Sequence, residues 1–280
     1  MVVNHHWYSD VEGGRVVGAA TVARLHADPT FRADLDAARQ EIAAVRAKGV
    51  PPAGDCEAEA KALALGFQAS DVIAIDILLE PDATMVRRAE ANNARLVKLF
   101  PKGFALDAIH TPHITLIQRF VRTDDLDKVY AALDAVVARA DVTAMKLEAF
   151  KYYYLPNKDV GAAGIVAKPT PELRKLQADL IAAVAPFTVE TGDSAAFVTT
   201  PDDPIIDPFL IEYVSTFVPK ASGEFFNPHV TTGVALRSDL DRMLAEPFEP
   251  FTFSPAGAAV YQLGQFGTAA KKLRDLGAKP

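Results

Sequence analysis

The sequence has one cysteine, one tryptophan and no excess of positive charge. Cys56 cannot form an intramolecular disulfide, and no cysteine pair or Cys/His cluster has the spacing of a zinc site. The 29 Lys and Arg residues are outnumbered by 36 Asp and Glu residues, which gives a formal net charge of −7. A chain of this charge has no global positive field with which to hold a long nucleic acid duplex, although a local basic pocket is still allowed.

Long apolar runs are also missing. The apolar stretch nearest the N-terminus, VVGAATVA at residues 16–23, is far too short to span a bilayer. It continues into a charged helical pattern, so we expect the first turns of a helix in a cytoplasmic protein rather than a signal peptide or a membrane anchor. Half of the residues are hydrophobic, which excludes wholesale disorder and provides for a sizeable core.

The periodicity of the apolar residues predicts helices and strands in a mixed order. Residues 19–48 are rich in alanine and end at the helix stop signal GVPP, which indicates an N-terminal helical arm. Thr170 and Pro171 mark the start of a later helix, because threonine caps helices and proline suits their first turn. The expected order is strand 71–79, helix 83–99, strand 110–120, helix 124–140, strands 145–155 and 161–167, and helix 170–185. This order predicts an α+β fold with helices packed outside the sheets.

Two short segments carry the same pattern of residue types. His113-Ile114-Thr115 and His229-Val230-Thr231 each read histidine, β-branched apolar residue, threonine, with a proline immediately before the histidine. Because side chains alternate along a strand, the histidine and the threonine of each segment point to one face, and the apolar residue points to the core. The histidines are 229 − 113 = 116 residues apart, so each motif can lie in its own half, with the two strands facing each other across a cleft.

Cleavage of a phosphodiester gives a chemical reason for such a pair. In-line displacement at phosphorus needs a base to take the proton of the nucleophile and an acid to protonate the leaving oxygen. Histidine suits both tasks because its pKa of about 6.5 leaves both protonation states accessible near neutral pH. Threonine hydroxyls can hydrogen-bond the nonbridging oxygens and hold the phosphorus between the imidazoles. The scheme requires no metal and no cofactor.

The paired motifs resemble the HxT signatures of the 2H phosphoesterase superfamily, the LigT-like or 2′-5′ RNA ligase-like cyclic phosphodiesterases. The resemblance runs from about residue 71 to the end and includes AVYQLGQFGTAAKKL, which is similar to the family's last strand. HITL fits the family form, whereas HVTT has Thr232 where an apolar residue is usual. The domain division that follows is a helical extension at 1–70 and a 2H phosphoesterase-like domain at 71–280.

This resemblance implies an architecture and a set of site residues. Two lobes of mostly antiparallel sheet, related by a pseudo-twofold axis, are expected to flank a central groove. His113 and His229 become the acid/base pair, and Thr115 and Thr231 bind the substrate phosphate. Which histidine is the base depends on how the substrate lies, and the sequence leaves that open.

Other residues near the motifs have competing interpretations. Tyr153 of the run at 152–154 and Phe226, just before the second motif, are candidate walls of the groove, although for each of them a place in the core is the safer interpretation. His110 and His113 form HxxH, but three residues apart on a strand means opposite faces, so we expect His110 to be structural or at the rim. The acidic cluster Asp202, Asp203 and Asp207 could hold Mg²⁺, but turn chemistry in a proline-rich loop explains it better.

The favoured hypothesis is a metal-independent phosphoesterase acting on 2′,3′-cyclic phosphates or related small diesters. Its partner would be a small nucleotide or an RNA terminus bearing a cyclic phosphate, and not a long duplex or a membrane. The alternatives are an RNA-end enzyme that forms or cleaves 2′-5′ linkages, a nucleotide- or RNA-binding protein without turnover, and a metal-dependent hydrolase using His110, His113 and the acidic cluster.

Overall fold

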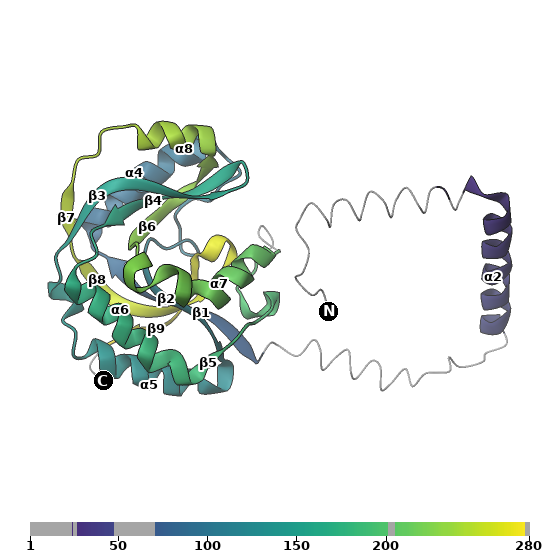
Figure 1. The fold of residues 1–280 in the computed structure, drawn as a ribbon, viewed down its shortest axis with the longest axis horizontal. Helices are drawn as coiled ribbons and strands as arrows, with labels where there is room; N and C mark the ends of the chain where they lie inside the picture. The colour runs from purple at the N-terminus through teal and green to yellow at the C-terminus, as the bar shows by residue number, and fades with distance from the viewer. Residues whose placement is uncertain (1–23, 25–26, 48–70, 201–204, 278–280) are drawn as a thin grey trace. The chain divides into compact units, whose positions relative to one another are not determined.

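The computed structural model describes residues 24, 27–47, 71–200 and 205–277, and the chain divides into two units, residues 1–66 and 67–280 (Figure 1). In the first unit, helix α2 spans Pro29–Ala47. The carboxylate of Asp28 caps it by accepting hydrogen bonds from the backbone N–H groups of Thr30 at 2.7 Å and Phe31 at 3.2 Å. Cys56, residues 16–23 and most of the predicted extension at 1–70 lie outside the described residues.

The second unit is built on one curled sheet of nine strands, and every pairing in it is antiparallel (Figure 1). The strand order is β7-β3-β4-β6-β2-β1-β8-β9, with β5 paired to β2. The predicted α+β class with mostly antiparallel strands is confirmed. The strands are β1 (Val72–Pro81), β2 (Ile114–Arg122), β3 (Leu147–Asn157), β4 (Val160–Ala167), β5 (Thr188–Val189), β6 (His229–Leu236), β7 (Phe251–Phe253), β8 (Pro255–Leu263) and β9 (Ala269–Leu276).

Apart from β5, which is added beside β2, the sheet consists of two halves of four strands each, β7-β3-β4-β6 and β2-β1-β8-β9, with one HxT motif strand at the inner edge of each half. The halves meet where Ile114 of β2 pairs with Val230 of β6. The motif strands are therefore direct neighbours in the sheet, and do not face each other across a cleft as their sequence spacing allowed.

Both motif strands have a β-bulge at the same place. Leu78 of β1 pairs with Thr115 but Ile77 pairs with Ile117, so that Leu116 is skipped. In the other half, Gly164 of β4 pairs with Thr231 but Ala163 pairs with Gly233, so that Thr232 is skipped. Each bulge directly follows the threonine of its motif, and each changes the phase of the side chains beyond it.

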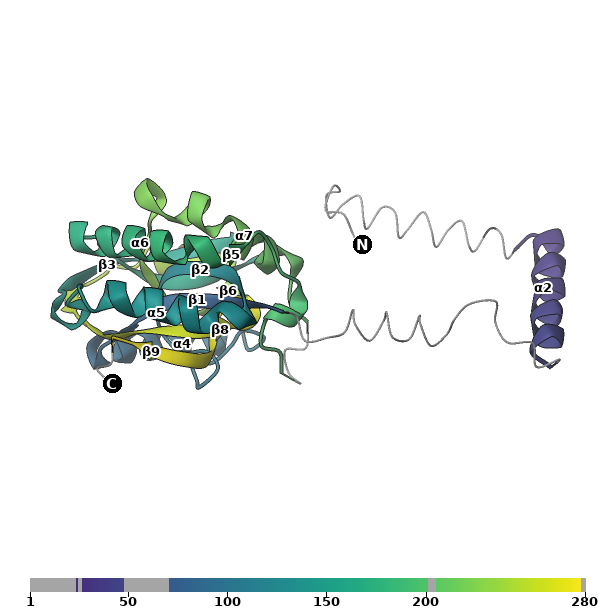
Figure 2. The same ribbon diagram turned by 90° about the horizontal axis from the view of Figure 1, so that it is seen from below.

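Helices cover both faces of the half that contains β1 and β2 (Figure 2). Apolar residues of α5 and α6 pack on the face that carries Ile73, Ile75 and Val121, whereas α7 packs on the face that carries Ala74 and Phe120. No described helix has the length and apolar character needed to cross a bilayer. The helices of this unit are α4 (Ala83–Leu99), α5 (Leu126–Val137), α6 (Pro171–Val184), α7 (Pro208–Ala221) and α8 (Arg237–Leu244).

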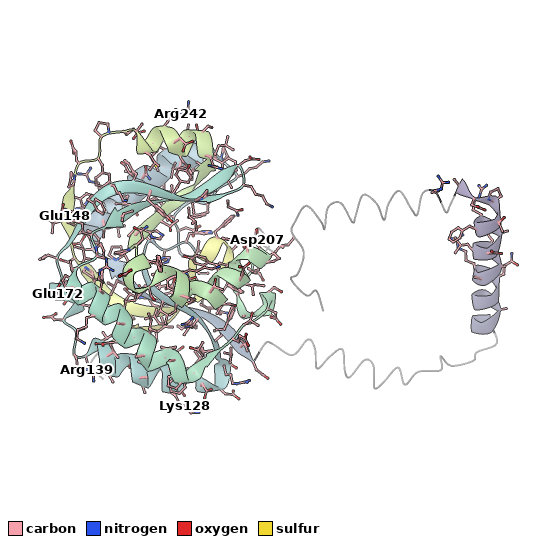
Figure 3. All side chains as sticks on the ribbon, in the orientation of Figure 1. Lys128, Arg139, Glu148, Glu172, Asp207 and Arg242 are labelled. Carbon is pink, nitrogen blue, oxygen red and sulfur yellow. The ribbon has the colours of Figure 1, made fainter. Side chains whose placement is uncertain are left out.

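Charged side chains such as Lys128, Glu172 and Arg242 lie at the periphery of the unit, as Figure 3 shows.

The short 3₁₀ segments are η1 (Thr123–Asp125), η2 (Val142–Ala144), η3 (Ala185–Phe187), η4 (Ser194–Ala196), η5 (Gly223–Phe225) and η6 (Gln265–Gly267). The helix predicted at 124–140 is thus a 3₁₀ turn followed by the shorter α5.

Thr232, the residue that departs from the family pattern, is fully buried at the bulge of β6. Its hydroxyl accepts a hydrogen bond from the Asn92 side chain of α4 at 2.8 Å and donates one to the carbonyl of Ala163 at 3.3 Å. The neighbouring Asn93 donates to the carbonyl of Thr232 at 3.0 Å. Gly233 follows with a φ of 141°, which a residue with a side chain rarely adopts. A polar residue is accommodated here because α4 supplies its partners.

Replacing Thr232 with valine should destabilise this unit, because the shape is kept but the buried amide of Asn92 loses its oxygen acceptor. We expect the free energy of unfolding to fall by about 1–3 kcal/mol, measured by urea denaturation. Thr143→Val is the matched control, since Thr143 is exposed and its loss should cost less than ~0.5 kcal/mol. Equal losses in the two variants would show that the buried hydrogen bond is not the cause.

Candidate active site

The four motif side chains that the sequence singled out line one cavity of about 410 Å³. Ile114 pairs with Val230, and continuing this antiparallel register by one residue in each direction sets His113 opposite Thr231 and Thr115 opposite His229. Ile114 and Val230 are fully buried in the core on the other face. The pairing therefore brings two imidazoles and two hydroxyls together on one side of the sheet.

Both imidazoles are oriented by the same backbone contact. The Nδ1 atom of His113 lies 2.6 Å from the carbonyl oxygen of Thr111, and that of His229 lies 2.7 Å from the carbonyl oxygen of Asn227. A carbonyl only accepts hydrogen bonds, so each Nδ1 carries a proton and each Nε2 is left as the reactive nitrogen. The proline between each carbonyl and its histidine keeps the preceding residue extended, which aims that carbonyl at the ring.

Glycine at position 164 makes room for the second imidazole. Gly164 of β4 pairs with Thr231, next to the ring of His229. A Cβ atom placed on Gly164 would lie 3.2 Å from Cδ2 of His229 and 3.0 Å from the carbonyl oxygen of Val230. Because both contacts are tight, a side chain at this position would displace the ring or the strand.

A buried carboxylate, Asp76 of β1, accompanies the first motif only. Its Oδ2 atom lies 3.4 Å from Nε2 of His113, and accepts hydrogen bonds from the Thr115 hydroxyl at 2.8 Å and the Gln118 amide at 3.1 Å. Asp76 has no exposed surface. Asp76 was not predicted as a site residue, although an acidic residue inside the apolar run VIAIDILL is a signal, since buried charges are nearly always paired.

The second half of the sheet has no counterpart of this carboxylate. Asp76 pairs with Gln118, three residues after Thr115, and the position three residues after Thr231 is Val234, which pairs with Ala162. At equivalent positions beside the two motifs, an acidic and polar pair therefore corresponds to an apolar pair. One imidazole faces a negative charge and the other does not.

These surroundings shift the pKa values of the two histidines in opposite directions. Burial opposes protonation of His113, but the hydrogen bond and charge of Asp76 outweigh it and raise the His113 pKa above its ordinary value. Burial lowers the pKa of His229, and the nearby His113 lowers it further, while the carbonyl of Asn227 offsets this only in part. The arrangement therefore favours protonation of His113 over protonation of His229.

The two threonines differ as well. The Thr115 hydroxyl donates its proton to Asp76, so it can donate to a phosphate oxygen only by giving up that bond. Within the described part of the chain, no hydrogen bond engages the Thr231 hydroxyl, which also lines the cavity. Thr231 is the readier donor of the pair.

The aromatic residues predicted as groove walls do line the cavity. The ring centre of Tyr153 lies 5.2 Å from that of His229, and burial raises the Tyr153 pKa. Its neighbours point elsewhere, since Tyr152 packs edge-on against Phe248 and the Tyr154 hydroxyl donates to Asp241 at 2.7 Å. Phe226 also lines the cavity, and its ring is buried against the core.

Helix α7 forms one side of the cavity and was not predicted. Its start was readable in Asp207-Pro208, because the Asp207 side chain accepts from the backbone N–H of Phe209 at 2.9 Å and proline occupies the first helical turn. The β-branched and aromatic residues of the helix obscured that signal. From its inner face, Tyr213 contributes a phenol whose pKa burial raises to about 12, so that it is neutral.

Among the described residues, those considered for metal binding do not form a metal site. His110 was expected on the opposite face of the motif strand, but β2 begins only at Ile114, and His110 lies in the preceding turn. Its Nδ1 atom is 2.8 Å from Asp107, and its ring stacks on Phe104 at 4.8 Å. Asp202 and Asp203 lie outside the described residues, and Asp207 caps α7. Over the described ranges, no group of three His, Cys, Asp or Glu side chains is placed to hold a metal ion.

Comparison with solved structures finds distant likenesses, two of which are given below. TT0787 of Thermus thermophilus is 18% identical with a TM-score of 0.43, and Usb1 of Kluyveromyces marxianus is 9% identical with a TM-score of 0.37. Each alignment covers 73% of this chain and 97% of the other.

Similarity to curated proteins is confined to short segments. The chain is 36% identical to an acid phosphatase of Zymomonas mobilis subsp. mobilis over 52 residues, which are 19% of this chain and 20% of that protein. It is 37% identical to a non-specific acid phosphatase of Providencia stuartii over 46 residues, which are 16% of this chain and 18% of that protein. The chain spans about a fifth of the length of these relatives.

Comparison with family models gives a match over more than half of the chain. The model of the 2′-5′ RNA ligase superfamily matches residues 86–263, a range that includes both HxT motifs, α7 and the strands between them. With paired motifs on neighbouring strands of a curled antiparallel sheet, the chain belongs to the 2′-5′ RNA ligase superfamily of 2H phosphoesterases.

Proposed function

We propose that residues 71–280 form a phosphoesterase that hydrolyses 2′,3′-cyclic phosphates, or related small nucleotide and RNA-end diesters, without a metal. The observation that carries this proposal is that two imidazoles in one cavity have surroundings that shift their pKa values in opposite directions. His113 lies beside the buried carboxylate of Asp76, and His229 has the apolar Ala162–Val234 pair at the equivalent position. One histidine is thereby favoured as an acid and the other as a base. Residues 1–70 are a separate helical extension in this proposal.

The setting of each histidine suggests its role. The neutral Nε2 of His229 takes a proton from water as the water oxygen bonds to phosphorus. On the opposite side the bond between phosphorus and the leaving 2′ or 3′ oxygen breaks, and Nε2–H of His113 protonates that oxygen. The product is a phosphate monoester, and transfer of one proton from His229 to His113 through solvent restores the enzyme. Asp76 stabilises the charged form of His113 before the transfer.

The alternatives differ in what they require of these residues. Forming or cleaving 2′-5′ linkages at RNA ends would use the same acid and base, so substrates decide between the two enzymes. A protein that only binds nucleotides has no need of two imidazoles held in different protonation states. A metal-dependent hydrolase would lose its activity when a chelator is added.

The cytoplasmic location stays a prediction.

Both histidines should be required for turnover in the presence of excess EDTA. On a panel of nucleoside 2′,3′-cyclic phosphates, we expect His113→Ala and His229→Ala each to lower kcat/KM by ~10² or more, as for loss of a general acid or base. His110→Ala is the matched control, since that imidazole contacts Asp107 and Phe104. Far-UV circular dichroism checks that each variant folds. Turnover that needs added metal, or that survives both substitutions, would refute the mechanism.

The pH dependence of kcat/KM should be bell-shaped, because turnover needs His229 neutral and His113 protonated. The lowered His229 pKa sets the low-pH limb, and the raised His113 pKa sets the high-pH limb. Asp76→Asn removes the charge that raises the His113 pKa, so the high-pH limb should move to lower pH. Rates over about pH 5–9 and NMR titration of the imidazoles measure this shift.

A matched control for that experiment is Asp107→Asn, which removes the carboxylate beside His110 and should leave both limbs in place. If the high-pH limb of Asp76→Asn stays where it is in the wild type, then Asp76 does not set the protonation of the acid.

A further inference from the structure

Seven aromatic residues line the cavity together with the four motif side chains. Helix α7 lines the cavity with side chains spaced four residues apart, Phe209, Tyr213 and Phe217, whose neighbouring ring centres lie 6.2 and 5.8 Å apart. Phe225 of η5 and Phe266 of η6 add rings from two other segments. The phosphate position proposed above thus lies at the base of an aromatic cavity.

The aromatic residues at the rim are exposed to solvent. Phe209, Phe225 and Phe266 are 49%, 69% and 47% exposed, and no other phenylalanine among the described residues is as exposed as these. All three line this one cavity. Phe266 also has a φ of 60°, in the left-handed region that an aromatic residue seldom adopts. Exposed apolar surface gathered around a cavity, partly at a cost in backbone energy, indicates a ligand with flat apolar groups.

Charge, in contrast, is scarce in the cavity walls. Among the described lining residues, Glu212 and Lys220 of α7 are the only Asp, Glu, Lys or Arg, and they pair with each other at 3.5 Å. A protein that binds a nucleic acid strand combines stacking rings with a cationic groove that follows the phosphates. This cavity has the rings but offers no excess of positive charge beyond the protonated His113.

We propose that the site selects a phosphodiester with a single negative charge and a flat aromatic group, and disfavours substrates that carry further phosphates. The scissile phosphate lies between the histidines, and the aromatic group stacks on the exposed rings at the rim. Within the function proposed above, on which this inference rests, the preferred substrate is a single nucleoside cyclic phosphate and not the end of an RNA chain.

The substrate preference is tested with three adenosine compounds: adenosine 2′,3′-cyclic phosphate, the same compound with a 5′-phosphate, and a trinucleotide that ends in a 2′,3′-cyclic phosphate. We expect kcat/KM to fall by roughly tenfold when the 5′-phosphate is added, mainly through KM, because the described cavity walls hold the carboxylate of Glu212 and a lysine already paired with it. The trinucleotide should be no better than the 5′-phosphorylated compound. Glu212→Gln, which leaves Lys220 unpaired, should reduce the discrimination.

The stacking surface is tested by substitution at the rim. Phe225→Ala should raise KM for adenosine 2′,3′-cyclic phosphate by about tenfold at unchanged kcat, which is the usual cost of losing a base-stacking ring. Phe225→Trp should restore the KM. Ribose 2′,3′-cyclic phosphate has no base, so its KM should not respond to Phe225→Ala. Leu99→Ala, which truncates an exposed residue outside the cavity, is the matched control.

The outcomes separate this inference from the function on which it rests. If cyclic phosphates are hydrolysed but the 5′-phosphorylated compound or the trinucleotide is equal or better, the single-charge preference is wrong and the function stands. If the KM values for adenosine and ribose cyclic phosphates rise equally in Phe225→Ala, the stacking role is wrong. If no compound is turned over, the proposed function falls and the inference falls with it.

Discussion

The pairing of Ile114 with Val230 is the constraint on which the site depends. It is the contact that joins the two halves of the sheet, and it aligns the HxT motifs so that all four polar side chains share one face. Both apolar residues are fully buried, which holds the register, because a slip of one residue would turn the imidazoles into the core and the apolar side chains into the cavity. The chemistry of the site is therefore tied to the packing of the core beneath it.

The symmetry of the two motifs is broken by their neighbours and not by the motifs themselves. Each histidine donates from Nδ1 to a carbonyl two residues earlier, and each threonine is followed by a bulge. Asp76 pairs with Gln118 beside the first motif. At the equivalent positions beside the second motif, Ala162 pairs with Val234. Two identical side chains thus acquire opposite pKa shifts, as acid and base catalysis on the two sides of one phosphorus requires.

Segments far apart in the chain supply the rest of the cavity. Gly164 of β4 leaves space for the His229 ring, α7 supplies a row of aromatic side chains, and Phe266 reaches the rim from η6. The bulge at Thr232 is held by hydrogen bonds from Asn92 and Asn93 of α4, so a helix supports the strand whose imidazole lines the cavity. None of these contacts joins residues close in sequence.

Features that arise from local order along the chain could be predicted from the residues alone. Helix α4 has the bounds that its amphipathic spacing predicts, and α6 begins after Thr170 with Pro171 in its first turn, as capping chemistry requires. The motif residues were also readable, because alternation along a strand fixes which side chains share a face. The α+β class followed from the order of these elements.

Which strands are neighbours in the sheet, and therefore which side chains meet in the cavity, depends on the tertiary fold. Strand pairing joins residues far apart in the chain, and periodicity carries no information about the partner of a strand. Asp76 of the first strand was therefore not predicted as the partner of His113, and the acid and the base could not be assigned. Helix α7 was missed for another reason, because its composition resembles that of a strand. The resemblance to a family supplied the roles of the motif residues, but the pKa shifts depend on side chains brought together by folding.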